Sequence, residues 1–260
     1  MKSKISIVLM VGFVVCLCSL TTLAQEEEQK AQAYYLLDVA VKPSMIAEYE
    51  AAVKVYLPLN AEYKATYPWY AFSVEDFHYY FVIPVENLAD VDNMFKEDSE
   101  LEKKMGEEKS KEIGKLFAGT YEYVHTYIIY HRPDLSYTPE SPRLQPEEAN
   151  YRKWIWYYIQ PDKAEEYQEI LKKFIPLNQS KNVSDGYNIY AGGLGMDMPA
   201  YLVAFSAKSA ADQEIHYERI IESLGEEAMA LLQKMFTLTR ELDIKTGWFR
   251  PDLSYAPKEK

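Results

Sequence analysis

Cysteine is scarce in this sequence: Cys16 and Cys18 are the only two, and both lie in an N-terminal apolar run. If that run is removed as a leader, the remaining chain can hold no disulfide, no thiolate nucleophile and no cysteine–metal site. Positive charge is scarce as well, since 28 Lys and Arg residues stand against 40 Asp and Glu residues. Binding to nucleic acid or to an acidic membrane surface needs clustered positive charge, so no nucleic-acid partner is predicted and such membranes are disfavoured.

Glycine is the third scarce residue, with 10 in the chain, whereas tyrosine is abundant at 23. The glycine-rich stretch at 192–195 contains no lysine and is not followed by a predicted helix, which excludes a phosphate-binding loop. With 48% apolar and 26% charged residues among 260, the composition is that of a folded globular protein. The chain is long enough for one large domain or two of ordinary size.

The N-terminus has the pattern of a secretory signal peptide. Two lysines precede an apolar run at 5–20, and Thr22 and Ala24 place small residues before a cut after position 24. The run is shorter than the ~20 residues that span a bilayer, which disfavours a retained anchor. We therefore predict a signal peptide at 1–24 and a solvated tether at 25–32. The mature protein is expected to be exported to the periplasm or exterior of a bacterial cell, with no membrane-spanning segment.

The main organisational feature is an internal repeat at a constant offset of 118 residues. The segment Tyr-Leu-Pro-Leu-Asn at 56–60 returns as Phe-Ile-Pro-Leu-Asn at 174–178. The segment Arg-Pro-Asp-Leu-Ser-Tyr at 132–137 returns unchanged at 250–255. These matches predict a tandem duplication. Its units are expected at 33–138 and 151–257, joined by a proline-rich linker at 139–150.

Hydrophobic periodicity predicts the order β-α-β-β-α-β in each unit. Strands are expected at 33–41, 69–74, 78–83 and 121–131, and again at 151–159, 187–192, 200–206 and 241–249. A first helix should begin after Ser44 as its N-cap, and longer helical regions at 87–118 and 209–238 should break near Asp98 and Gly225. Pro58 and Pro176 lie late in the first helix of each unit and are expected to kink or end it.

This order, twice in tandem, resembles the ferredoxin-like unit. The chain is similar to the dimeric α+β barrel superfamily, which includes the antibiotic-biosynthesis-type monooxygenases. The resemblance implies an α+β fold in which two ferredoxin-like units pack sheet to sheet around a barrel, here within a single chain as a monomeric pseudo-dimer. No catalytic motif accompanies the resemblance, so it concerns the fold rather than a function.

The predicted strands place polar and aromatic side chains on one face, which in a barrel would line the interior. In the first unit that face carries two histidines, an aspartate and several tyrosines, whereas the second unit has Glu241, Asp243 and Lys245 in place of the histidines. We therefore expect any site to belong to the first unit. Its predicted ligand-binding residues are Asp38, His78, Tyr80, Tyr123, His125 and Tyr127. They suit a small aromatic or sugar-like ligand, or acid–base chemistry; the alternative is that they only fill the barrel.

Six residues of the repeated segments are assigned structural roles: Asn60, Asn178, Arg132, Asp134, Arg250 and Asp252. The two asparagines are expected to bond backbone at a turn or helix end, although a binding role is the alternative. Each arginine precedes a proline, which marks the exit from a strand. Pairing with the nearby aspartates, or across the units, is expected to lock the two units together; a ligand clamp by either arginine is the alternative.

No metal site is predicted, because the candidate set of His78, His125, Asp38 and Glu122 lacks a short ligand spacing. No cofactor is predicted, although the resemblance leaves haem open: some members of the superfamily hold it, and the histidines at 78, 125, 131 and 216 are candidate axial ligands. Three functions remain. The protein binds a small ligand in the barrel, serves as a non-catalytic scaffold of the cell envelope, or is a cofactor-free monooxygenase-like or haem-binding enzyme.

Overall fold

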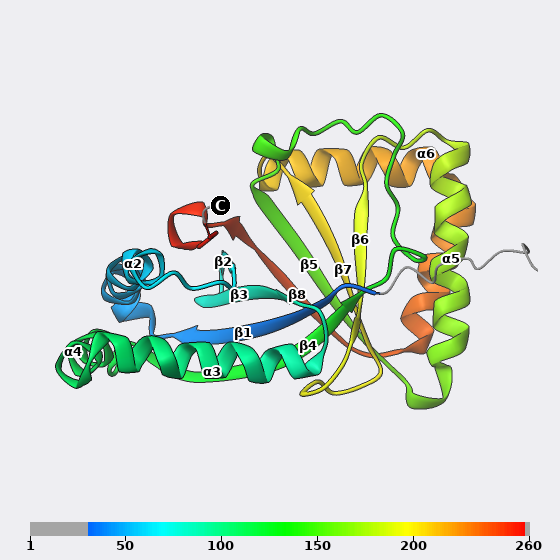
Figure 1. The fold of residues 1–260 in the computed structure, drawn as a ribbon. Helices are drawn as coiled ribbons and strands as arrows, with labels where there is room; N and C mark the ends of the chain where they lie inside the picture. The colour runs from blue at the N-terminus through cyan, green and yellow to red at the C-terminus, as the bar shows by residue number, and fades with distance from the viewer. Residues whose placement is uncertain (1–30, 258–260) are drawn as a thin grey trace, which may run out of the picture. The chain divides into compact units, whose positions relative to one another are not determined.

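The computed structural model describes residues 31–257, and the predicted signal peptide and most of the predicted tether lie outside the described residues. The described chain forms a closed barrel of antiparallel strands in the order β1-β3-β2-β8-β5-β7-β6-β4, with helices outside it (Figure 1). The predicted α+β barrel is therefore confirmed. The strands are β1 (Ala33–Val41), β2 (Tyr70–Val74), β3 (His78–Val85), β4 (Tyr121–His131), β5 (Tyr151–Ile159), β6 (Tyr187–Gly192), β7 (Ala200–Ala207) and β8 (Thr239–Phe249).

The helices largely follow the predicted pattern, with two corrections. They are α2 (Ile46–Glu62), α3 (Leu88–Met105), α4 (Glu107–Phe117), α5 (Ala164–Ser180) and α6 (Ala210–Leu238). Ser44 is not an N-cap, because it lies inside the short 3-10 turn Pro43–Met45 that precedes α2. The break in the first long helical region falls at Gly106 rather than near Asp98, because only the glycine takes the required φ of 83° without steric cost. The predicted break at Gly225 is confirmed, with a φ of 70° inside α6.

Pro58 and Pro176 lie inside α2 and α5, and both helices continue for about another turn, so the expected stop does not occur. The buried side chains of Asn60 and Asn178 lie in this final turn. Each amide donates a hydrogen bond to the carbonyl four residues earlier, at 3.0 and 2.6 Å respectively. The two asparagines thus bond backbone at a helix end.

Each half of the chain pairs its four strands in the same pattern. In the first half β1 lies between β3 and β4, and β2 is the outer partner of β3. In the second half β5 lies between β7 and β8, and β6 is the outer partner of β7. Two seams join the halves, β2 with β8 and β4 with β6. Both seams are short, so the barrel closes through few backbone contacts.

The repeated Arg-Pro-Asp-Leu-Ser-Tyr segments cross from each half to the other. Leu135, which follows β4, is fully buried in a cluster built from β5, β6, β7, α5 and α6. Leu253, which follows β8, is fully buried against β1, β2, β3 and α2. Ser136 accepts a hydrogen bond from the backbone of β6, and Ser254 accepts one from the backbone of β2, both at 2.9 Å. The two segments therefore hold the halves together reciprocally.

The arginines of these segments pair with the neighbouring aspartates. Arg132 donates two hydrogen bonds to Asp134, at 2.8 and 2.7 Å, and Arg250 binds Asp252 in the same way, at 2.9 and 2.8 Å. Arg250 also contacts both carboxylate oxygens of Glu50 on α2. These hydrogen bonds lower the pKa of the Glu50 carboxyl, and the ion pair joins the end of the second half to the first.

One face of the strands is covered by helices, and the other face lines the barrel interior. Figure 1 shows α2, α3 and α4 beside the strands of the first half, and α5 and α6 beside those of the second. The barrel interior has its own cluster, in which large side chains from both halves meet: Leu36, Val74, Tyr80, Ile129, Trp154, Trp156 and Leu202. These side chains therefore fill much of the interior. The space that remains is lined by polar residues in addition to members of this cluster.

Candidate functional site

A cavity of about 520 Å³ lies at the end of the barrel where β3 and β4 begin. All six residues predicted to bind a ligand line this barrel-end cavity: Asp38, His78, Tyr80, Tyr123, His125 and Tyr127. Strand register explains their meeting. Asp38 on β1 is directly opposite Tyr80 on β3 and His125 on β4, and opposed residues of antiparallel strands point to the same face.

The second half contributes to the same cavity, which the sequence analysis did not anticipate. Trp156 and Tyr158 come from β5, and Asp243 and Lys245 come from β8. The expectation that the first unit alone would carry a site is thus too narrow. The alternating pattern of β8 placed the two charged residues on one face, but only the β2–β8 seam determines which residues of the first half they meet.

Asp38 and His78 form the closest polar pair of the cavity. The Nδ1 atom of His78 lies 2.6 Å from a carboxylate oxygen of Asp38, and both side chains are largely buried. The hydrogen bond to Asp38 raises the pKa of His78, although burial opposes the shift. A carboxylate that holds one imidazole nitrogen fixes the ring, and such a ring can take or give a proton at its other nitrogen.

Lys245 lies across the cavity, between two carboxylates. Its Nζ atom pairs with Asp76 and lies 3.4 Å from Asp243. Burial lowers the pKa of Lys245, but the two aspartates more than offset this and hold the pKa above its ordinary value. The lysine is therefore a charged group whose charge is already matched within the protein.

The glycine-rich loop between β6 and β7 forms one wall. The backbone N–H of Ile128 on β4 donates to the Leu194 carbonyl at 2.9 Å, which holds the loop against that strand. Gly195 has a φ of 89°, and a Cβ atom there would lie 2.5 Å from the Thr126 carbonyl oxygen, so only glycine permits this approach. The loop is the predicted hairpin connection, and it brings Asp197 to the cavity.

We expect the Asp38–His78 pair to stabilise the fold at lower pH and to lose that contribution as the pH rises. The folded pKa of His78 is raised above the value of ~6.5 expected in the unfolded chain. The stabilisation is therefore fully present below about pH 6.5 and is lost as the pH rises through the folded pKa. Urea unfolding of the wild-type protein and of Asp38→Asn should show a difference in free energy that shrinks as the pH rises from about 6.5 through the folded pKa of His78. A difference that stays constant over this range would contradict the assignment.

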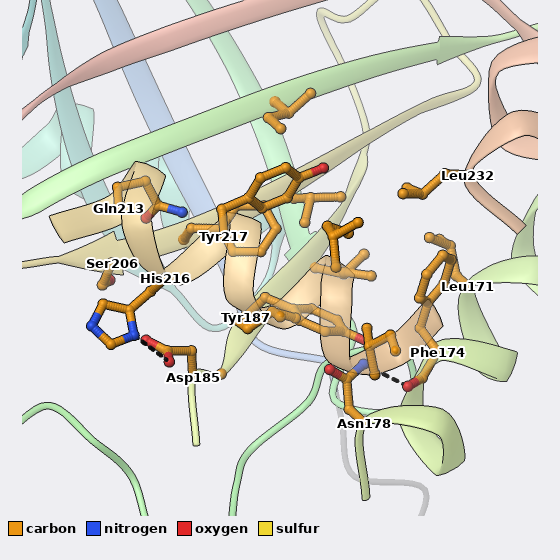
Figure 2. Close-up of a pocket in the computed structure, with 18 of the residues that line it drawn as sticks. Leu171, Phe174, Asn178, Asp185, Tyr187, Ser206, Gln213, His216, Tyr217 and Leu232 are labelled. Carbon is orange, nitrogen blue, oxygen red and sulfur yellow. Dashed lines mark hydrogen bonds and ion pairs between the residues drawn. The ribbon is translucent and has the colours of Figure 1, made fainter. Parts of the chain in front are cut away.

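A second cavity, of about 110 Å³, lies in the second half between the sheet and helices α5 and α6 (Figure 2). Its walls are mostly apolar, and Tyr187 from β6 is among them. The hydroxyl oxygen of Tyr187 is buried without a hydrogen-bond partner, and burial raises the pKa of this tyrosine. Sequence reasoning missed this helix–sheet cavity, because its apolar residues follow the same helical and strand spacing as core residues that leave no space.

Charged residues surround one side of the helix–sheet cavity. Arg143 of the predicted linker donates to Asp185 at 2.8 Å and to both oxygens of Asp212 at 3.0 and 3.1 Å. The two nitrogens of His216 lie 3.8 Å from Asp185 and 3.5 Å from Asp212, and Figure 2 shows the first of these contacts. The linker is thereby tied to α6 and to the segment that precedes β6.

The charges around the two cavities do not favour a haem. The helix–sheet cavity is smaller than the ~300 Å³ at which pockets for drug-sized ligands begin, and both His216 nitrogens face carboxylates. The barrel-end cavity has Asp38, Asp197 and Asp243 in its wall, which would repel the negatively charged propionates of a porphyrin. We therefore derive no step through this group.

Within residues 31–257, no group of three or more His, Cys, Asp or Glu side chains is arranged to hold a metal ion. The candidate set of His78, His125, Asp38 and Glu122 is therefore not arranged as a metal site. None of the helices in this part of the chain is long and apolar enough to cross a membrane.

No family model matches the sequence, and no curated protein matches it. Among solved structures, an anthrone oxidase-like protein has a TM-score of 0.58 at 12% identity, with 89% of this chain and 95% of the other covered. A candidate monooxygenase from Lactobacillus acidophilus NCFM has a TM-score of 0.51 at 9% identity, over 87% and 97% of the two chains. Chlorite dismutase from Candidatus Nitrospira defluvii, in complex with imidazole, has a TM-score of 0.50 at 11% identity, over 87% and 94%.

These similarities show the fold alone, because all identities are low. They confirm the predicted resemblance to the dimeric α+β barrel superfamily at the level of the fold.

Proposed function

We propose that this protein binds a small aromatic or sugar-like ligand in the barrel-end cavity. The observation that carries the proposal is the cavity itself: the six predicted residues line a space of about 520 Å³, within the ~300–1,000 Å³ typical of ligand pockets. Tyrosine and tryptophan rings supply flat apolar surfaces against which a ring can pack. The Asp38–His78 pair and Lys245 supply polar groups that can orient it.

The proposal extends to the organisation of the chain. The matching strand pairings of the two halves support a tandem duplication of a ferredoxin-like unit, at 33–138 and 151–257 with the linker at 139–150. The reciprocal contacts of Leu135 and Leu253 support a monomer that is locked as a pseudo-dimer. We also propose that the protein is exported after residues 1–24 are removed. Mass spectrometry of the mature N-terminus tests this cleavage.

A ligand screen tests the binding site. Aromatic compounds and monosaccharides that bind only the folded state should raise the thermal midpoint in proportion to the logarithm of their concentration. We expect His78→Ala to remove this response while leaving the unliganded protein folded. Glu122→Gln is the matched control, because Glu122 is beside Tyr123 on β4 but does not line the cavity. A hit that stabilises wild type and His78→Ala equally would place the ligand elsewhere.

The Asp38–His78 pair also supports a second candidate, a cofactor-free enzyme with His78 as a general base. Its ring is oriented by Asp38 at 2.6 Å and reaches a cavity large enough for a substrate. The similarity in fold to a candidate monooxygenase and to an anthrone oxidase-like protein agrees with this candidate. Product formation from any ligand found in the screen, lost in His78→Ala, would distinguish an enzyme from a binding protein.

A further inference from the structure

We propose that the barrel-end cavity selects a positively charged ligand: a protonated amine carried on a hydroxylated ring compound, such as an amino sugar or a hydroxylated aralkylamine. This inference rests on the proposed function, since it names the class of ligand for the same cavity. It follows from three properties of the cavity wall, which are its charge, its aromatic lining and its unpaired polar groups.

The wall carries more negative than positive charge. Asp38, Asp197 and Asp243 all line the cavity, and Lys245 is the cationic side chain among the lining residues. Lys245 is itself paired with Asp243 and, outside the lining, with Asp76. Its charge is therefore matched, and His78 and His125 are the remaining lining groups that can oppose the aspartates. Asp38 is paired with His78 and Asp243 with Lys245, whereas Asp197 has no ion pair within residues 31–257. The excess of carboxylates in the wall favours a cation over an anion.

The tyrosines of the cavity respond to the same negative potential. Burial raises the pKa of Tyr80, and Asp38, Asp76 and Asp243 raise it further. Burial likewise raises the pKa of Tyr127, with added contributions from Asp38 and Asp243. The aspartates that raise these pKa values come from both halves, so the negative potential is not confined to one ion pair.

Aromatic side chains supply the second property. Tyr80, Tyr127, Trp156 and Tyr158 line the cavity together. Aromatic faces attract a cation that lies within ~6 Å of the ring centre, most strongly where water is excluded. Tyr127 and Tyr158 are partly buried and present ring surface to the cavity, whereas Tyr80 and Trp156, at 1% and 2% exposed, present almost none. An acidic, aromatic-lined cavity is the arrangement by which proteins bind organic ammonium groups.

Unpaired polar groups supply the third property. No hydrogen bond in residues 31–257 involves the Tyr80 hydroxyl or the Trp156 indole N–H, and neither atom is among the fully buried atoms without a partner, which are the Tyr167 and Tyr187 hydroxyls. Both residues line the cavity, so these two groups are available to a ligand. The indole N–H can only donate, so its partner on a ligand must be an acceptor such as a hydroxyl or ring oxygen. A ligand that carries an oxygen beside its amine would supply this acceptor.

Two sets of matched probes test this inference by isothermal titration calorimetry at pH 7. The first set is glucosamine, glucose and glucuronate, and the second is 2-amino-1-phenylethanol, 1-phenyl-1,2-ethanediol and mandelate. Within each set the skeleton is kept and the charge changes from positive to neutral to negative. We expect the amine of at least one set to bind about tenfold more tightly than its neutral partner, and the acid to bind most weakly. The two sets distinguish a sugar ring from an aromatic ring.

Charge variants identify where the selectivity arises. Asp243→Asn and Asp197→Asn each remove a carboxylate of the wall, and each should reduce the preference for the amine severalfold while leaving the neutral probe unaffected. Glu122→Gln removes an exposed negative charge beside Tyr123 on β4 but outside the lining, and should leave the preference unchanged. Thermal midpoints of the unliganded variants verify that each is folded.

Failure of this inference and failure of the proposed function give different results. If a neutral probe binds as tightly as its amine, or if the acid binds best, the charge preference is wrong while the barrel-end cavity stands as a binding site. If none of the six probes binds, or if binding is unaffected by His78→Ala, the proposed function is wrong and this inference falls with it.

Discussion

Replacement of Leu135 by alanine is expected to lower the free energy of unfolding by about 2–5 kcal/mol. Leu135 is 0% exposed, and although it follows the last strand of the first half, it is buried among residues of the second half such as Tyr157, Tyr167 and Ile170. Truncation removes apolar contacts and leaves a space that these neighbours, fixed on a strand and a helix, can fill only in part.

Leu253→Ala is the matched variant for the contact that the second half makes with the first. Leu253 is also 0% exposed, but it is buried in the first half beside Val39, Tyr49 and Tyr79. Urea unfolding should show a loss of similar size for both variants, and Leu194→Ala, at a residue 71% exposed, should change stability by less than about 0.5 kcal/mol. If either buried leucine behaves like Leu194, the reciprocal contacts do not stabilise the fold as described.

Gly247→Ala is the second substitution with a large expected effect, a loss of about 3 kcal/mol. Gly247 pairs with Val74 at the β2–β8 seam. A Cβ atom at Gly247 would lie 2.0 Å from the Ser73 carbonyl oxygen and 2.7 Å from the Val74 Cα atom, and such contacts are too short for any side chain. Because these are backbone atoms, the strands must separate, and the seam has only three paired positions to lose.

Gly114→Ala is the control for a glycine with space around it. Gly114 lies inside α4, and a Cβ atom there meets nothing within 4 Å. Alanine favours a helix over glycine, so this variant should gain about 0.5–1 kcal/mol. Thermal or urea unfolding of the two variants should therefore shift in opposite directions. If the unfolding midpoints of both variants shift by the same amount, the strands at the seam can accommodate the added methyl group.

Local patterns in the sequence were sufficient for most elements. Alternating side chains predicted β1 and β5 at their observed bounds, and the same alternation placed Asp38, His78 and Tyr80 on one face. Gly225 marked the kink in α6 because a positive φ excludes most other residues. These features depend on a few neighbouring residues, which a sequence displays directly.

Features that depend on distant residues were not predictable in the same way. The break at Gly106 is an exception, because the glycine itself was a local signal that could have located it, and Asp98 lies inside the regular helix α3. The contribution of Asp243 and Lys245 to the barrel-end cavity follows from which strands meet at a seam. The helix–sheet cavity follows from how closely apolar side chains pack, which their identity and spacing do not determine.

The short seams have a consequence for the order in which the protein folds. The β4–β6 seam pairs Ile129 with Gly192, whereas the β2–β8 seam pairs Phe72 with Phe249. The entropy lost in closing a loop grows with its length, and during synthesis β8 is the last strand to emerge. Until it does, β2 has an open edge that another chain could pair with. Closure of the β2–β8 seam is therefore the late step of folding and the interval of greatest exposure to aggregation, and the bond from the β2 backbone to Ser254 secures it once formed.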